Sequence, residues 1–169
     1  MSISLTVPIA GDAIRGLKIG DTITVSGQIY AGRDAALPKL IKLARQGLAE
    51  EHGIPLEGGV IFHSAVSIAG VGPTSSNKLE IESSIGPLSE MGVMIHLGKG
   101  AIRNETVREL AEWGSVYAVI PPVTAMLNHL TECREVAAFP EEGMEALYSL
   151  WVRDYPAIIA AAHGESIYK

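Results

Sequence analysis

Apolar and polar residues alternate along the chain in segments typical of strands and of helices. Residues 22–30 (TITVSGQIY) are rich in β-branched side chains and predict a strand, whereas the apolar residues of 35–48 (AALPKLIKLARQGL) fall near helical spacing. Residues 59–71 predict two short strands or one bent strand. Further along we expect strands at 93–97 and 115–120, helices from 104, through 125–130 and near 144–151, and additional segments at 135–139 and 157–162. This alternation favours an α/β or α+β fold over a fold built from one element type.

The length and composition fit one domain that spans residues 1–169. The chain is 47% hydrophobic and 19% charged, which is typical of a globular protein rather than a disordered one. Its formal net charge of −6 argues against non-specific nucleic-acid binding. No apolar stretch approaches the ~20 residues of a membrane-spanning helix, and the N-terminus lacks the basic region of a secretory signal. We therefore expect neither nucleic-acid nor membrane partners.

Cys133 is the single cysteine of the chain. With one cysteine, the chain cannot form an intrachain disulfide. It also cannot hold an iron–sulfur cluster by its own thiolates, because such clusters normally have three or four thiolate ligands. A reducing, cytoplasmic compartment is the natural expectation. The five histidines show no metal-ligand spacing, so we assign no metal to this chain alone. His63 and His96 lie in or beside apolar strands and are expected to be hydrogen-bonded core or edge residues rather than catalysts.

Three predicted strand ends are followed by glycine-containing turns that each carry one cation. These cations are Arg33, Lys78 and Lys99. Strand ends of this kind usually position ligand-contacting groups in α/β proteins. If the three turns converge, they would form a pocket for a substrate with more than one carboxylate, because arginine grips a carboxylate with two donors and lysine adds a point charge. For Arg33 the alternative is a local pair with Asp34 or a surface charge.

The segment 72–78 (GPTSSNK) concentrates hydroxyl groups and backbone N–H groups beside one lysine. Glycine permits a close backbone approach, and successive N–H groups in a turn can form an anion-binding concavity. Thr74 is the candidate hydroxyl for proton transfer, provided that a neighbouring charge or a network of donors activates it. The alternative is an ordinary Gly-Pro turn in which Thr74 caps the next turn.

Five stretches in order along nearly the whole chain carry a family resemblance. They are LKIGDTITVSGQIYAGRDAA, VGPTSSNKLE, MGVMIHLGKG, WGSVYAVI, and the terminal DYPAII with HGESIY. Together they resemble the beta subunit, or C-terminal domain, of class I iron–sulfur fumarases and L(+)-tartrate dehydratases. One such motif alone would be weak, but five at suitable spacing make the resemblance specific.

The resemblance implies a swivelling β/β/α domain that serves a hydro-lyase acting on a dicarboxylate, either fumarate/malate or tartrate. A partner alpha subunit is expected to carry a 4Fe–4S cluster, whose open iron binds the substrate as a Lewis acid, and an alpha2beta2 assembly is suggested. By position, Arg33, Lys78 and Lys99 would bind substrate carboxylates, and Thr74 would assist proton removal from the carbon beside a carboxylate. The expected catalytic pair is thus Thr74 and Lys99, and Gly72 and Ser75 complete the expected substrate-binding set.

The chain departs from the family pattern at several positions. Leu37 stands where a family histidine is usual, Lys78 stands in place of an arginine, and Pro121-Pro122 replaces a Gly-Gly pair. Lysine keeps the charge but loses the planar two-donor grip of arginine. Two alternatives therefore stay open, namely a hydro-lyase subunit for another hydroxy-acid and a non-catalytic domain that binds a dicarboxylate.

Overall fold

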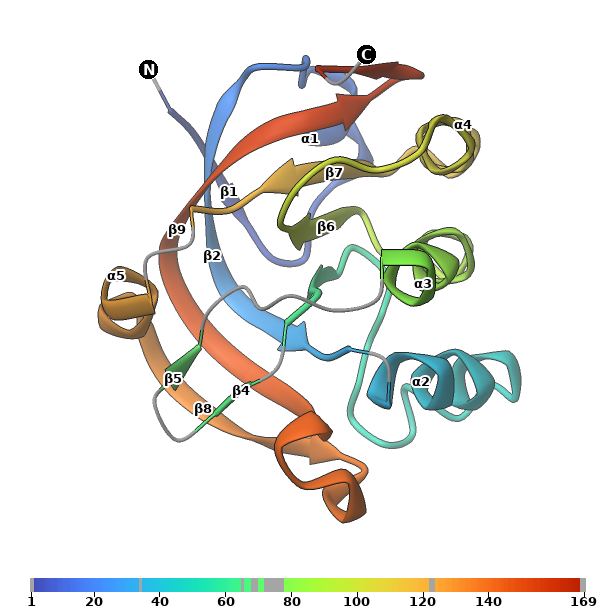
Figure 1. The fold of residues 1–169 in the computed structure, drawn as a ribbon, viewed down its shortest axis with the longest axis vertical. Coiled ribbons are helices and arrows are strands. Elements are labelled where there is room, and N and C mark those ends of the chain that lie inside the picture. The colour runs from blue at the N-terminus through green and yellow to red at the C-terminus, as the bar shows by residue number, and fades with distance from the viewer. Residues whose placement is uncertain are drawn as a thin grey trace.

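The computed structural model of the chain shows a mixed α/β fold around one barrel-like sheet (Figure 1). It describes residues 2–33, 35–64, 66–67, 70–71, 78–121 and 124–167. Its architecture confirms the predicted α/β class and is consistent with a swivelling β/β/α domain. Within the described residues, no helix is long and apolar enough to cross a membrane.

Parallel strands form the central part of the sheet. Four of them, β2 (Thr22–Ala31), β3 (Val60–Phe62), β6 (Ile95–Gly98) and β7 (Val116–Val119), lie side by side in that order. Strand β1 (Ile3–Thr6) also pairs in parallel with β2, along Ile23–Ser26. Parallel strands require crossover connections, and most of the helices of this protein lie in those connections.

One long strand closes the sheet on itself. Strand β9 (Leu147–Ala162) has 16 residues and pairs antiparallel with both β2 and β7. It therefore joins the two sides of the parallel set and leaves the strands arranged as a barrel (Figure 1). Shorter strands complete the structure: β8 (Thr131–Ala138) and β10 (Glu165–Ser166) on β9, and a separate pair formed by β4 (Val66–Ser67) and β5 (Gly70–Val71).

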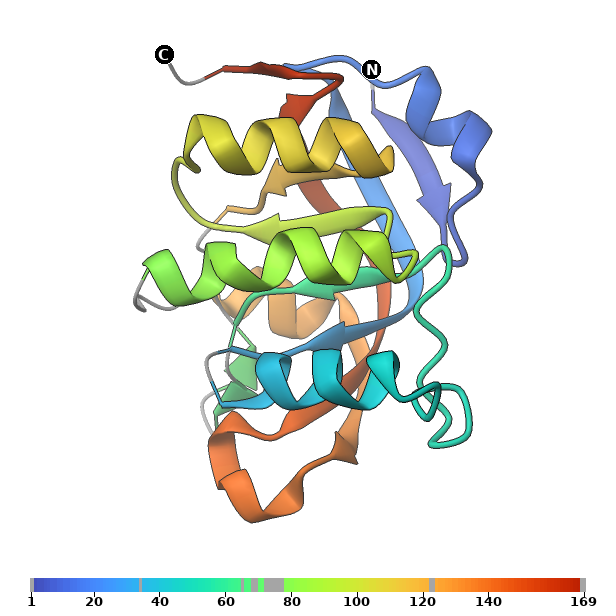
Figure 2. The ribbon, with the colours of Figure 1, turned by 90° about the vertical axis from the view of Figure 1, so that its right-hand side faces the viewer.

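Three helices form a layer on one side of the parallel strands. Helices α2 (Ala36–Arg45), α3 (Lys78–Glu90) and α4 (Asn104–Trp113) lie next to one another in this layer (Figure 2). The remaining helical segments are α1 (Gly11–Arg15), α5 (Thr124–His129) and the 3₁₀ segment η1 (Pro140–Glu145). The arrangement has a helix layer, a sheet and a strand-lined interior.

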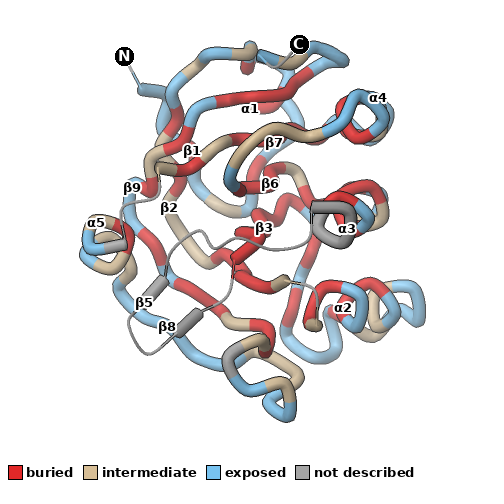
Figure 3. The backbone as a smooth tube through the Cα atoms, viewed as in Figure 1, coloured by how far each residue is buried: buried red, intermediate tan, exposed pale blue. Residues whose placement is uncertain are grey.

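Successive side chains along each strand point alternately into the barrel interior and toward the helix layer, which divides the core into two parts. Phe62 and Leu97 are buried inside the barrel, whereas Ile61 packs with residues of α2 and α3 and Tyr117 packs with residues of α3 and α4. This two-residue period is the one expected for strands that are covered on both faces. Figure 3 shows the same division, with buried positions along the strands and on the helix faces turned toward the sheet.

The strands predicted for the parallel region are confirmed, whereas the helix predicted near the C-terminus is wrong. The expected strands at 22–30, 93–97 and 115–120 correspond to β2, β6 and β7. The helix expected near 144–151 is wrong, because residues 147–151 belong to strand β9. Apolar residues there fit either period, and pairing of β9 with β2 on one side and β8 on the other selects the strand. Helix α3 was not expected from the sequence.

Candidate functional site

The carboxyl ends of three adjacent parallel strands bring two of the predicted cations to one edge of the sheet. Ala31, Phe62 and Leu97 are neighbours in the strand register of β2, β3 and β6. Arg33 lies two residues after Ala31, and Lys99 lies two residues after Leu97. Since neighbouring strands lie about 4.8 Å apart, the ends of β2 and β6 lie roughly 10 Å apart, with the end of β3 between them. This edge is where α/β proteins usually bind ligands.

The helices of the layer begin at the same edge. In Figure 2, α2, α3 and α4 all begin on the left, which is the side toward which β6 and β7 point. Arg33 lies between β2 and α2, Lys99 lies between β6 and α4, and Lys78 is the first residue of α3. The structure describes the backbone of Lys78 but not its side chain. The first turn of a helix carries a partial positive charge, so the helix starts add to the positive potential of the cations.

The remaining predicted site residues fall outside the described part of the chain. Gly72, Thr74 and Ser75 lie in the segment 72–77, between β5 and α3. Their assignment therefore stays a prediction. Leu37, which stands where the family has a histidine, lies in the first turn of α2 and is buried in the core, at 1% exposure.

Arg33 forms an ion pair that sequence analysis missed. Its Nη2 and Nε atoms lie 2.8 Å and 3.2 Å from Oε1 of Glu145, the last residue of η1. The side chains are 19% and 37% exposed, so the pair is partly shielded from water. The alternative of a local pair with Asp34 concerns a residue outside the described ranges. No local signal marks Glu145, which is 112 residues away in sequence.

The loop that carries Lys99 is held by the neighbouring strand. Lys99 is exposed, and the hydroxyl of Tyr117 on β7 donates a hydrogen bond to the carbonyl oxygen of Gly100 at 2.9 Å. Gly98 makes this contact possible, because a Cβ at that position would lie 2.9 Å from the Tyr117 hydroxyl oxygen. The glycines around Lys99 thus have a packing role beside any role in ligand binding.

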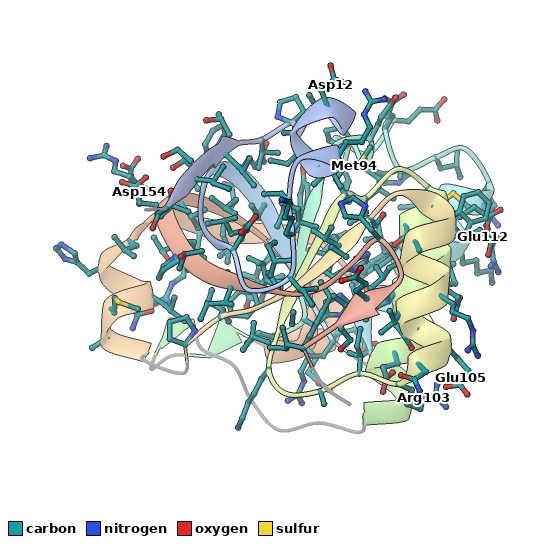
Figure 4. All side chains as sticks on the ribbon, turned by 90° about the horizontal axis from the view of Figure 1, so that it is seen from above. Asp12, Met94, Arg103, Glu105, Glu112 and Asp154 are labelled. Carbon is teal, nitrogen blue, oxygen red and sulfur yellow. The ribbon has the colours of Figure 1, made fainter. Side chains whose placement is uncertain are left out.

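A buried carboxylate fixes the far end of the same loop. Glu82 on α3 is 3% exposed, and its Oε1 accepts hydrogen bonds from the backbone N–H of Arg103 and the hydroxyl of Thr106, each at 2.7 Å. Arg103 immediately precedes α4, and Figure 4 shows it beside Glu105 at the start of that helix. Glu82 therefore ties α3 to the beginning of α4, where the Lys99 loop ends.

Two histidines form a buried chain between the sheet and α3. Nε2 of His63 lies 2.9 Å from Nδ1 of His96, and Nε2 of His96 lies 2.8 Å from the hydroxyl of Ser89 on α3. His96 lies between Ile61 and Tyr117 in the strand register and so points toward the helix layer. Burial lowers the pKa of His63 to about 3, and burial together with the charge of His63 lowers the pKa of His96 well below its usual value. Both are core histidines, as expected.

The described residues do not form a metal-binding group. No set of three or more His, Cys, Asp or Glu side chains in the described ranges is close enough to hold a metal ion. Cys133 is exposed on β8, which pairs with β9 rather than with the parallel strands. One thiolate does not fit the ligand requirement of a four-iron cluster.

Comparison with known proteins gives the family of the chain. The family described as Fumarase C-terminus matches residues 1–169. A provisionally named L(+)-tartrate dehydratase subunit beta of Methanocaldococcus jannaschii is 28% identical, over 92% of this chain and 86% of that protein. The L(+)-tartrate dehydratase subunit beta of Escherichia coli is 27% identical, over 96% of this chain and 85% of that protein.

A second type of relative is longer than this chain. A provisionally named class I fumarate hydratase of Geobacillus stearothermophilus is 29% identical over 99% of this chain, which spans 34% of that protein. The family match covers the whole stretch of sequence in which the five motifs lie. The chain belongs to the fumarase C-terminus family.

Proposed function

We propose that this chain is the beta subunit of a hydro-lyase that adds or removes water across the carbon–carbon double bond of a dicarboxylate. Fumarate/malate is the first candidate substrate and tartrate the second. Relatives that match most of this chain are named as tartrate dehydratase beta subunits or class I fumarate hydratases. The observation that carries the proposal is the location of Arg33 and Lys99 at the ends of β2 and β6, on either side of β3.

The cations at this edge are proposed to bind the carboxylates of the substrate. Arg33 presents a planar guanidinium that can donate two parallel hydrogen bonds to one carboxylate, whereas Lys78 and Lys99 supply point charges. When a proton leaves the carbon beside a carboxylate, negative charge builds up on that carboxylate. Lys99, which we assign to this carboxylate, stabilises the charge more than it stabilises the ground state and so lowers the barrier, whereas Arg33 holds the substrate in place.

Thr74 is proposed to take that proton, with Gly72 and Ser75 contributing donors to the same substrate. A threonine hydroxyl is a weak base, so its role depends on nearby positive charge. The Lys78 ammonium and the start of α3 follow Thr74 closely in the chain and would supply it. The proposal treats residues 1–169 as one beta-subunit domain.

A partner alpha subunit is proposed to hold the 4Fe–4S cluster. The single cysteine of this chain does not fit that role. When bound, such a cluster supplies Lewis-acid activation of the substrate hydroxyl. An alpha2beta2 assembly in the cytoplasm is part of the same proposal, since a single exposed cysteine suits a reducing compartment.

The test is turnover by the reconstituted complex. The chain is co-produced with a candidate cluster-bearing alpha subunit, and fumarate, malate and the tartrate enantiomers are assayed as substrates. We expect Lys99→Ala to lower kcat/KM at least 100-fold on the best substrate while the unfolding curve stays unchanged. Lys42→Ala, which removes an exposed lysine on α2, is the matched control.

Each outcome separates the open alternatives. Turnover of a different hydroxy-acid would replace the substrate and keep the reaction class. Dicarboxylate binding without turnover in a complex that contains an intact cluster would support the non-catalytic binding domain instead. Equal kinetics for Lys99→Ala and Lys42→Ala would remove Lys99 from the site.

A further inference from the structure

The geometry of the Arg33–Glu145 pair restricts the orientation of the Arg33 guanidinium. Two nitrogens on one edge of the group, Nε and Nη2, donate to the same oxygen of Glu145 at 3.2 Å and 2.8 Å. A contact that uses two adjacent donors restricts rotation of the guanidinium plane about the end of the side chain. A single contact to one nitrogen would leave that rotation free.

The backbone on both sides of the pair is anchored in the sheet. Ala31 on β2 is the register partner of Tyr148 on β9, and the two strands run antiparallel. Arg33 continues from β2 while Glu145 leads into β9 through Ala146, which is 1% exposed. Arg33 follows the last residue of β2 by two positions, and Glu145 precedes the first residue of β9 by two positions. Groups this close to paired strands are held more exactly in position than groups in the middle of long loops.

We propose that Glu145 is a positioning residue for Arg33 that sets the orientation in which the guanidinium receives a carboxylate of the substrate. The inference rests on the proposed function, in which Arg33 binds that carboxylate. Recognition of a carboxylate by arginine depends on the direction of the guanidinium plane, because the donors lie in a fixed fork. Glu145 acts on one edge of this fork and thereby restricts the directions in which the rest of it can point. Glu145 itself does not touch the substrate.

A second ion pair on the same segment provides an internal control. Lys39 on α2 lies 2.9 Å from Oε1 of Glu142 and 3.5 Å from Oε2 of Glu141, both in η1. This pair also connects η1 to the α2 region, but Lys39 lies within α2 rather than at a strand end. If Glu145 merely attached η1 to the protein, loss of Glu142 would have the same effect as loss of Glu145.

The experiment compares Glu145→Gln, Glu145→Asp and Glu142→Gln in the complex with the alpha subunit. Gln keeps the size of the side chain and removes its charge, and Asp keeps the charge on a shorter arm. For the best dicarboxylate, we expect Glu145→Gln to raise KM about tenfold, in line with loss of a hydrogen bond to a charged group. The same variant should change kcat less than threefold. Glu145→Asp should fall between Gln and the wild type, and Glu142→Gln should match the wild type.

A double-mutant cycle shows whether the effect passes through Arg33. In an Arg33→Lys background the two-donor contact is absent, so adding Glu145→Gln should leave KM unchanged. A fall in KM for Glu145→Gln would mean that Glu145 competes with the substrate and would overturn the inference. An unchanged KM, equal effects of Glu145→Gln and Glu142→Gln, or a full effect in the Arg33→Lys background would also overturn it.

The wild-type complex separates this inference from the proposed function. If the wild type turns over a dicarboxylate and Glu145→Gln leaves its KM unchanged, only the role of Glu145 fails. If the wild type, with its cluster intact, turns over none of the dicarboxylates, the proposed function fails and the inference fails with it.

Discussion

His63 and His96 share a hydrogen bond, 2.9 Å between Nε2 and Nδ1, that is buried between the parallel strands and helix α3. The second ring nitrogen of His96 continues the chain to Ser89, which is 3% exposed. Adding a proton to either ring would place a charge in a site with little solvation, which is why burial lowers the pKa of both histidines. The pair is therefore neutral in the folded protein at physiological pH.

The first prediction concerns stability in acid. An unfolded histidine binds a proton near pH 6.5, whereas His63 in the folded protein has a pKa of about 3. Below pH 6.5 the unfolded state therefore binds more protons, and the free energy of unfolding falls as the pH falls toward 3. Each histidine contributes a slope of up to about 1.4 kcal/mol per pH unit in this window. Urea unfolding between pH 7 and pH 4 measures it.

Glutamine variants isolate the contribution of the histidines from that of the carboxylates. His63→Gln and His96→Gln remove a titrating ring but keep a hydrogen-bonding side chain, so their stability should depend less steeply on pH than that of the wild type. His129→Gln, which changes an exposed histidine at the end of α5, should follow the wild-type curve. Parallel curves for His96→Gln and the wild type would show that the pair does not control acid stability.

The second prediction concerns the contact between Tyr117 and the Lys99 loop. Tyr117→Phe keeps the ring but removes the hydroxyl that donates to Gly100, which should lower the free energy of unfolding by about 1 kcal/mol. Because the contact holds the loop, amide hydrogen exchange in residues 98–103 should become faster. Mass spectrometry of deuterium uptake measures this directly.

Tyr30→Phe is a matched control for this change. The Tyr30 hydroxyl also donates to a backbone carbonyl, that of Gly53 at 3.1 Å, and also lies in a partly buried position. Its loss should cost a similar stability but leave exchange in residues 98–103 as in the wild type. If both variants speed that exchange equally, the effect is global, and the Tyr117–Gly100 hydrogen bond does not specifically restrain the loop.

The third prediction concerns the buried carboxylate of Glu82. Glu82→Ala removes the acceptor for the Arg103 N–H and for the Thr106 hydroxyl, and Thr106 is itself 1% exposed. Leaving these donors without their acceptor should lower the free energy of unfolding by about 2–4 kcal/mol. Urea unfolding measures this change in the free energy of unfolding.

Glu112→Ala, near the other end of α4 (Figure 4), is the control and should change the free energy of unfolding by about 0.5 kcal/mol or less because Glu112 is exposed. Similar losses for the two variants would contradict a tie between α3 and α4 through Glu82.

Elements whose periodicity is local could be predicted from the sequence, whereas elements that depend on distant contacts could not. Strand β2 and helix α2 could be predicted because their side-chain patterns follow one period over many residues. Helix α3 contains Gly86 and Pro87, which lower helix propensity, and it forms because Ile85 and Leu88 are buried against the sheet and the neighbouring helices.

The candidate site divides in the same way. Arg33 and Lys99 could be selected from the sequence, because a cation in a glycine-containing turn after a strand is a local pattern. Glu145 and Glu82 could not, because each reaches its partner through packing of elements far apart in the chain. The roles of Thr74, Lys78, Gly72 and Ser75 remain predictions.

The sequence by itself determined which segments favour strand or helix and which turns carry cations, since backbone geometry imposes those periods on any few consecutive residues. Only the tertiary structure decided that β9 joins β2 to β7 and closes the sheet, and that Glu145 meets Arg33. These outcomes depend on the register between distant strands, which the combined packing of the core selects and no single segment encodes.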